Sequence, residues 1–330
     1  ITIDDCTSVL DFGRHKEMCY DAARGLSILE DSWVSQASAN QRRGRAGRVR
    51  PGICFRLFSR RQFRLLDQQQ QPEMLRVPLE RLCLQVKSII GDLPVGEILA
   101  GAITPPSSQA VSSALRNLQQ LAALEPPERL TPLGQHLSRM PMDARVGRML
   151  IFGAMLRCLD PILVIAASMG SKPPFYSPPD QREEADAAHK LFAAQSGKSD
   201  HLMIVDAFYG WLEAKGQGYS AEREYCDKHF ISQQAMQTIA AGREDYADVL
   251  ADLGFVPSLY TRWLRQGARA GRVDHDGHAH FNVYSKNKRV VKAVMTAGFY
   301  PNVVLVKHPE TTYIQTAGGA MDKDAKPKDL

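Results

Sequence analysis

The stretch Gln41-Arg42-Arg43-Gly44-Arg45-Ala46-Gly47-Arg48 is the most informative part of this 330-residue sequence. On a helix predicted over residues 37–48, Gln41, Arg45 and Arg48 fall at positions i, i+4 and i+7 and therefore share one face. Two guanidinium groups on one face can neutralise charge on a transferring phosphoryl group, and a glutamine beside them can orient the attacking water. The spacing therefore predicts a site that acts on a nucleoside triphosphate. The alternative is a solvated basic helix or a localisation signal.

The composition around this stretch supports the same interpretation. Gly44 and Gly47 have no side chain, which leaves room for a ligand, so both are expected beside a bound nucleotide. Between Gln41 and Leu66 there are nine arginines and no Asp, Glu or Lys. The rest of the chain carries 32 basic and 36 acidic residues, so this segment accounts for more than the whole net charge of +5. Arginine concentrated without acidic neighbours favours a ligand rich in phosphate.

The overall composition excludes several classes of protein. A length of 330 residues with 44% hydrophobic and 23% charged residues is typical of a globular chain of several domains, not of a disordered or collagen-like one. Six widely spaced cysteines predict neither a disulfide scaffold nor a metal site, and they favour the nucleus or cytoplasm over secretion. The apolar stretch 149–170 contains Arg157 and Asp160, which a bilayer would disfavour, so no membrane segment is expected.

Hydrophobic periodicity predicts a mainly α, multidomain fold. Strand and turn patterns dominate the first forty residues, and three short helices with an extended turn at 124–130 form a unit of winged-helix size. From residue 141 almost every segment has helical periodicity, which indicates a helical bundle. A polar, aperiodic segment after the bundle predicts an inserted loop, and short strands are expected near the end of the chain.

The motif that contains Gln41 also resembles a known family. Gln-Arg-x-Gly-Arg-x-Gly-Arg is the sixth helicase motif of superfamily 2, and its surroundings resemble the DEAH-box/RNA helicase A-like group. Residues 1–5 are similar to the tail of that family's fifth motif, and residues 72–80, 130–134 and 159–168 extend the likeness. The resemblance implies the C-terminal part of a second RecA-like domain (1–67), a winged helix (68–140), a ratchet bundle (141–258), an inserted loop (259–285) and the truncated start of an OB-fold (286–330).

The resemblance implies an activity as well. Members of this family are ATP-dependent RNA helicases, in which ATP and Mg²⁺ bind between two RecA-like domains. By resemblance, Thr2 and Asp4 line the ribose and phosphate side of the nucleotide. Gln41 orients the hydrolytic water, and Arg45 and Arg48 contact the phosphates. The expected partner is RNA, mainly single-stranded, with DNA or a G-quadruplex as further candidates.

A hairpin predicted between residues 16 and 33 is the expected contact with nucleic acid. In the family that the chain resembles, a hairpin at this place separates strands. Basic residues accompany it here (Arg14, Lys16 and Arg24), and Tyr20 could stack on a base. The alternative is an ordinary edge hairpin.

The chain also departs from the family pattern. It contains no Walker A loop, no DEAH carboxylate pair and no Ser-Ala-Thr motif. The string Gly197-Lys198-Ser199 is not a Walker A loop, because Phe192 stands where the first loop glycine belongs. The chain alone is therefore expected not to hydrolyse ATP. The alternative function is that of a non-enzymatic nucleic-acid-binding or adaptor protein derived from a helicase.

Overall fold

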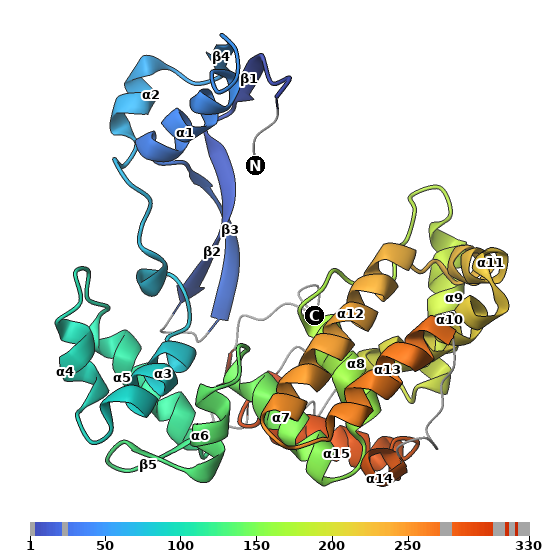
Figure 1. Cartoon of the computed structure of the whole chain (residues 1–330). Coiled ribbons are helices and arrows are strands. Elements are labelled where there is room, and N and C mark those ends of the chain that lie inside the picture. Colours follow the sequence, from blue (N-terminus) through green and yellow to red (C-terminus); the bar gives the residue numbers. More distant parts are fainter. Residues whose placement is uncertain (1–3, 22–25, 271–278, 306–313, 317–320, 323–330) are drawn as a thin grey trace. The chain divides into compact units, whose positions relative to one another are not determined.

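The chain folds into two compact units, of which unit 1 comprises residues 1–119 and 124–131 and unit 2 comprises residues 120–123 and 132–330 (Figure 1). Helices predominate in the element order, so the predicted mainly α, multidomain fold is confirmed. The boundaries of the five expected regions stay a prediction. The computed structural model describes residues 4–21, 26–270, 279–305, 314–316 and 321–322.

The N-terminal part of unit 1 is built on a two-stranded parallel sheet. β1 (Ser8–Asp11) pairs with β4 (Ile53–Arg56), and α1 (Gln36–Ala46) packs against both strands. Because side chains alternate along a strand, one face of this sheet meets α1, whereas Leu10 and Phe55 lie on the other face and are 63% and 52% exposed.

A small apolar core lies around α1. Val34, Ala39 and Leu66 are buried, and Phe58 and Phe63 pack against them. The short helix α2 (Arg60–Leu65) follows β4 and ends beside this core.

A long hairpin extends from the sheet (Figure 1). β2 (Arg14–Asp21) pairs antiparallel with β3 (Leu26–Trp33), which confirms the predicted hairpin; its turn, residues 22–25, lies outside the described residues. Gly13, with φ of +72°, starts the hairpin, and an added Cβ there would lie 2.7 Å from the Phe58 ring. Only glycine therefore fits at this position.

The second part of unit 1 has the element order expected for a winged helix. The turn predicted at 124–130 is an antiparallel hairpin, and the helices before it bury apolar residues such as Cys83, Leu84 and Leu118. A 3-10 turn, η1 (Glu73–Leu75), precedes α3 (Glu80–Ile90), α4 (Val95–Ala100), α5 (Ser108–Gln120), β5 (Leu124–Glu125) and β6 (Arg129–Leu130).

Unit 2 begins its regular structure with α6 (Pro132–Ser138), followed by α7 (Ala144–Met155), α8 (Leu159–Met169), α9 (Arg182–Gln195), α10 (Asp200–Gln217), α11 (Tyr219–His229) and α12 (Gln233–Asp252). α8 lies at the centre of this bundle, with residues 159–168 all buried and with α7, α10 and α12 packed against it (Figure 1). Among the helices described, none is long and apolar enough to cross a bilayer.

The loop predicted at 259–285 is largely helical where the structure describes it, so this prediction is wrong. α13 (Ser258–Ala270) buries Tyr260 and Leu264 one turn apart, and α14 (Ala279–Asn282) follows; residues 271–278 lie outside the described residues. One narrow apolar stripe is enough to pack a helix, and Arg262, Arg265 and Gln266 of α13 are exposed. For example, Arg265 forms an ion pair with Glu244 at 3.6 Å.

The end of the chain contains the two short strands expected near residues 303–306 and 313–315, and a third at Met321–Asp322 that the sequence did not predict. α15 (Lys288–Phe299) packs on α7, and β7 (Val304–Leu305), β8 (Ile314–Thr316) and β9 (Met321–Asp322) form an antiparallel sheet in that order. Whether this sheet starts an OB-fold stays a prediction.

A buried charged cluster joins four helices of unit 2. Asp160 Oδ1 accepts a hydrogen bond from Arg243 Nε at 2.7 Å, and Oδ2 accepts one from the Tyr209 hydroxyl at 2.9 Å. The Asp160 amide donates to Asn282 Oδ1 at 3.0 Å. Burial alone would lower the pKa of Arg243, but the Asp160 carboxylate raises it above its ordinary value. The cluster therefore holds α8, α10, α12 and α14 together through a charged pair.

Candidate functional site

The helix that carries the arginine motif is positioned from its first residue. The hydroxyl of Ser35, a buried residue, accepts a hydrogen bond from the Ser38 amide at 3.1 Å and caps α1. The Gln36 amide donates to the carbonyl of Asp67 at 2.8 Å, and its side chain donates to the carbonyl of Leu66 at 2.9 Å. These contacts fix the start of α1 to the segment that comes after α2.

Gln41 and Arg45 lie one turn apart on α1, so the structure places both on one face as predicted. Gln41 is exposed and Arg45 is half-buried. Arg48 is not on the helix, which ends at Ala46, and the prediction of a helix continuing to residue 48 is wrong. After the helix the chain folds back and brings Gly52 close to Ala46. A Cβ added to Gly52 would lie only 2.1 Å from the Ala46 carbonyl oxygen. Arg48 is exposed in the bend after the helix, and the roles of these side chains stay predictions.

The space beside Gly44 and Gly47 is open. A Cβ added to either residue would meet no described atom within 4 Å, so packing among the described residues does not require glycine at these two positions. The expected nucleotide contacts at the start of the chain are less defined. Asp4 is exposed in a turn before β1, and Thr2 lies outside the described residues.

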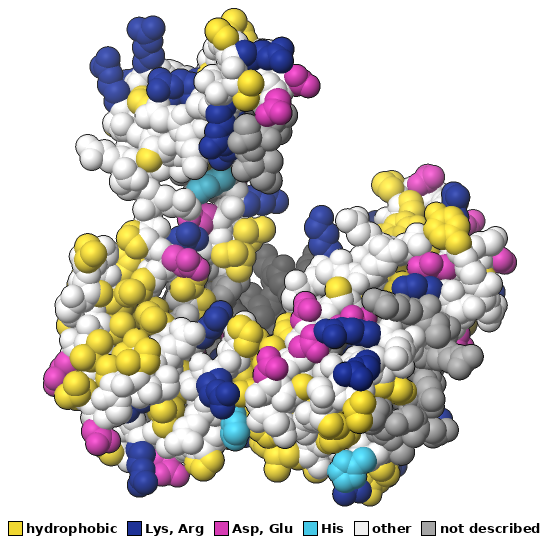
Figure 2. Space-filling model, viewed as in Figure 1, with side chains coloured by type: hydrophobic (Ala, Val, Ile, Leu, Met, Phe, Trp, Pro, Cys, Tyr) yellow, Lys and Arg dark blue, Asp and Glu magenta, His cyan; other side chains and the backbone are white. Residues whose placement is uncertain are grey.

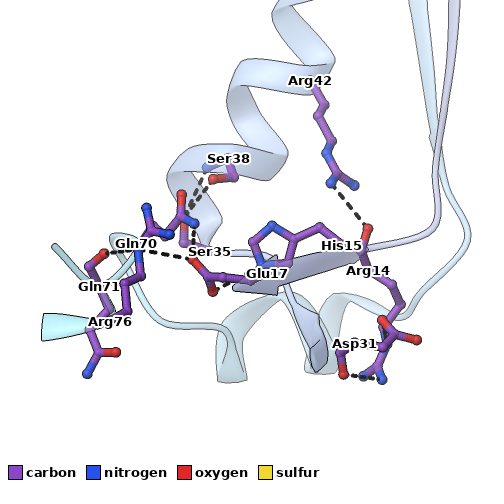
Figure 3. Close-up of polar contacts among 10 residues, drawn as sticks. All are labelled: Arg14, His15, Glu17, Asp31, Ser35, Ser38, Arg42, Gln70, Gln71 and Arg76. Atoms are coloured by element: carbon purple, nitrogen blue, oxygen red, sulfur yellow. Dashed lines mark hydrogen bonds and ion pairs between the residues drawn. The ribbon is translucent and has the colours of Figure 1, made fainter. Parts of the chain in front are cut away.

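Arg42, for which the sequence predicted no role, connects α1 to the sheet through an ion pair and hydrogen bonds. Its Nη1 donates to Asp11 Oδ1 at 2.8 Å, and the Asp11 side chain is 0% exposed. The Gly13 amide donates to the same oxygen at 3.0 Å, and Arg42 Nη2 donates to the carbonyl of Arg14 at 3.2 Å (Figure 3). Asp11 Oδ2 is buried and has no hydrogen-bond partner among the described residues. One guanidinium group thus balances a buried carboxylate and connects α1, β1 and β2.

Three of the residues predicted to contact nucleic acid lie on one face of the hairpin. Arg14, Lys16 and Tyr20 alternate along β2, and Arg24 lies outside the described residues. Arg14 also forms contacts within the hairpin, because its Nε pairs with Asp31 at 3.2 Å (Figure 3). Its guanidinium lies 4.9 Å from the centre of the Trp33 ring. Lys16 is exposed. The structure therefore groups three of the four predicted residues without testing their role.

The other face of the hairpin is fastened to the segment that leads towards the winged helix. Glu17 pairs with Arg76 Nε at 3.3 Å and with His15 Nε2 at 3.5 Å, and Gln70 donates a short hydrogen bond to it (Figure 3). The Tyr20 amide donates to the Arg76 carbonyl at 3.1 Å. The sequence did not predict that Glu17 binds Gln70 and Arg76, because these contacts join positions more than fifty residues apart.

Basic side chains gather on the surface around α1 and α2 (Figure 2). The exposed arginines there are Arg43, Arg48, Arg50, Arg60, Arg61 and Arg64. Within the part of the chain that the structure describes, no group of three or more His, Cys, Asp or Glu side chains could hold a metal ion.

Two regions of the chain match models of a known domain family. Residues 114–142 match the winged-helix part, and residues 143–204 the ratchet-like part, of the helicase associated domain (HA2). DHX57 of Homo sapiens is 40% identical over 99% of this chain and 24% of its own length. The DNA/RNA helicase DHX36 of Mus musculus is 42% identical, and the RNA helicase DExH1 of Arabidopsis thaliana is 40% identical, each over 93% of this chain and 29% of its own length.

The chain thus spans about a quarter of the length of these relatives, and it matches them along almost all of its own length. The matched HA2 regions cover the second half of α5 with β5, β6 and α6, and then the first helices of the unit 2 bundle. The Gln41 motif lies on α1, upstream of them. This chain belongs to the DEAH-box/RNA helicase A-like family of helicases.

Proposed function

We propose that this chain acts within an ATP-dependent RNA helicase, where Gln41, Arg45 and Arg48 serve ATP hydrolysis and the hairpin contacts single-stranded RNA. The arrangement of α1 carries the proposal. Gln41 and Arg45 lie one turn apart on a helix whose position is fixed by Arg42 and the buried Asp11. The relatives above are named as ATP-dependent helicases that act on RNA, or on DNA and RNA.

The residues of this site fit a triphosphate. Arginine side chains donate several hydrogen bonds in a plane that matches phosphate oxygens. Open space beside Gly44 and Gly47 leaves the backbone accessible to such a group. Arginine does not ligate Mg²⁺, which prefers carboxylate and phosphate oxygens, so the proposed role of this face concerns the nucleotide and not the metal.

In the proposed mechanism, bound ATP supplies the terminal phosphoryl group that water attacks. Gln41 accepts a hydrogen bond from that water and orients it. Arg45 and Arg48 donate to the phosphate oxygens and balance the charge that develops on them, a contribution of roughly a thousandfold or more in rate. The Arg42–Asp11 pair holds α1 against β1, so that Gln41 and Arg45 keep their position relative to the sheet.

In the proposed contact with RNA, the face of the hairpin that carries Arg14, Lys16 and Tyr20 meets the strand. Lys16 is exposed and can reach a phosphate, and Tyr20 can stack on a base. Glu17, on the opposite face, fastens the hairpin through Arg76, so that it can act as a stiff protrusion.

The decisive experiment compares Arg45→Ala with Gly44→Ala and Arg61→Ala in a complete enzyme that carries this chain. Arg45→Ala should reduce RNA-stimulated ATP hydrolysis about a thousandfold while RNA affinity changes little. Gly44→Ala should stabilise α1 by about 0.5 to 1 kcal/mol, since glycine disfavours a helix interior, yet it should lower hydrolysis by narrowing the open space. Arg61→Ala, which removes an exposed arginine from α2, should leave hydrolysis unchanged. Near-normal turnover of Arg45→Ala would refute the assignment.

Two further measurements separate the parts of the proposal. The purified chain alone should show no magnesium-dependent ATPase activity above background. In the complete enzyme, Tyr20→Leu should slow strand separation more than ATP hydrolysis, whereas Cys19→Ser, a neighbour on the opposite face of β2, should affect neither. Equal unwinding by the Tyr20 and Cys19 variants would remove the hairpin from the proposal.

A further inference from the structure

A second arginine-lined site lies on unit 1, between α1, β4 and α2. It is a pocket of about 330 Å³ whose lining includes Arg43 from α1, Arg56 from β4 and Arg60 from α2. The rest of the lining consists of Cys54, Phe58, Ser59 and Phe63, so no acidic side chain faces the pocket among the residues described. Its volume is at the lower end of that of small-molecule sites.

The pocket is distinct from the face proposed to meet ATP. Successive residues of an α-helix are rotated by about 100°, so Arg43 points about 160° away from both Gln41 and Arg45. Asn40, the neighbour of Arg43 on that side of α1, contacts Arg56 of β4. One helix therefore presents arginine in two opposite directions, and a nucleotide on the Gln41 face would not occupy the pocket.

Arg56 is held in place at the pocket. Its Nη2 donates to Asn40 Oδ1 at 2.9 Å, and its guanidinium lies 4.1 Å from the centre of the Phe63 ring. Arg43 and Arg60 are exposed, and neither forms an ion pair with a described residue. Like charges gathered without an acidic partner repel one another, and a bound anion relieves that repulsion.

We propose that this pocket binds a phosphoryl group through Arg43, Arg56 and Arg60. Arginine prefers phosphate because the planar guanidinium can donate two parallel hydrogen bonds to its oxygens. Phe58 and Phe63 limit the access of water on one side of the pocket, and this strengthens the contact. The phosphoryl group comes either from the backbone of a nucleic-acid strand or from a free nucleotide, and the two sources are distinguished by experiment.

The test measures the affinity of the purified 330-residue chain for a fluorescent single-stranded RNA dodecamer, for ADP and for inorganic pyrophosphate, all without magnesium. Arg43→Gln/Arg60→Gln is compared with Arg61→Gln/Arg64→Gln, which removes the same charge from exposed positions of the same region outside the pocket. The pocket variant should weaken binding about tenfold or more, and the control variant by less than about threefold.

The pattern among the probes identifies the source. Weakening confined to the dodecamer, with a smaller dependence of affinity on salt, indicates strand phosphates. Weakening that includes ADP and pyrophosphate indicates a free phosphate ligand. Equal effects of the two variants on every probe, or no effect of either, would overturn the proposal.

Cys54 offers a test on the unaltered chain, which does not depend on how the variants fold. This thiol lines the pocket and is half-buried, as are Cys6 and Cys19 outside it. A phosphoryl ligand should slow alkylation of Cys54 at least about threefold, as followed by peptide mass spectrometry, and leave at least one of the other two unchanged. If saturating pyrophosphate and saturating dodecamer both fail to protect Cys54 selectively, the proposal is wrong.

Discussion

Substitution of Arg42 by alanine should destabilise the N-terminal part of unit 1 by about 2 to 3 kcal/mol. Removing one partner of a fully buried ion pair costs about 3 to 5 kcal/mol, because the other charge is left buried without compensation. The Asp11 side chain is 0% exposed, but that of Arg42 is 35% exposed, so water can partly replace the lost guanidinium. Gly13 would still donate to Asp11 Oδ1, and Oδ2 already lacks a partner among the described residues.

The measurement should be local, because a chain with two compact units need not unfold in one step. Pulsed hydrogen exchange of the peptide covering residues 36–46, followed through a urea series, reports on α1 itself. With a denaturant slope of about 1 to 3 kcal/mol/M, the midpoint of Arg42→Ala should fall by about 0.7 to 3 M. Arg43→Ala, which removes the neighbouring arginine that forms no ion pair with a described residue, should shift the midpoint by less than about 0.5 M.

A second substitution tests whether Arg42→Ala is destabilising because it leaves the Asp11 carboxylate buried without a positive partner. Adding Asp11→Asn to Arg42→Ala removes the uncompensated charge and keeps an acceptor for the Gly13 amide, so it should restore about half of the loss or more. If Asp11→Asn destabilises the Arg42→Ala background further, the pair stabilises the sheet through packing and not through charge. If Arg42→Ala shifts the unfolding midpoint of α1 no more than Arg43→Ala does, the Arg42–Asp11 pair does not stabilise the position of α1.

Three further outcomes are expected from the structure. Asp160→Asn should lower the stability of unit 2 by about 3 to 5 kcal/mol, as thermal unfolding would show, because it leaves Arg243 buried without its carboxylate. Gly52→Ala should prevent normal folding of the N-terminal part of unit 1, whereas Gly47→Ala should not, because only the first added Cβ would meet backbone, at 2.1 Å; comparable hydrogen exchange of α1 in both would contradict this. Native alkylation near pH 8 should modify about three of the six thiols rapidly, since burial raises the pKa of three others. The slow thiols should be those of Cys83, with a pKa of about 12, and of Cys158 and Cys226, with a pKa of about 11.

Local periodicity in the sequence was sufficient to predict most of the helices and the shared face of Gln41 and Arg45. It failed at Arg48 because the residues beyond a helix decide where that helix ends. Pro51 disfavours a helical conformation in the residue before it, and Gly52 lets the chain return to the carbonyl of Ala46. It also failed at α13, where the buried stripe is only one turn long at Tyr260 and Leu264, so polar residues dominate the pattern.

The charged pairs could not be predicted, for a different reason. Asp11 and Glu17 look like ordinary surface carboxylates in the sequence, and although Asp160 stands in the apolar stretch 149–170, nothing near it identifies a partner. Their partners lie far along the chain: 31 residues separate Asp11 from Arg42, and 83 separate Asp160 from Arg243. Only the fold brings them together, and burial then makes the pairing obligatory.

These pairs change how the arginine-rich segment should be understood. The absence of acidic residues between Gln41 and Leu66 suggested an unbalanced positive charge, yet Asp11 from β1 compensates Arg42, and Asn40 and Phe63 hold Arg56. Fewer arginines are therefore available to ligands than the count suggests, and their side chains point in particular directions. Because α1 presents Arg45 on one side and Arg43 on the other, a phosphate-rich ligand on one face need not compete with one on the opposite face. A rotation of α1 would move both faces together, and the Arg42–Asp11 pair opposes such a rotation because it fastens α1 to β1.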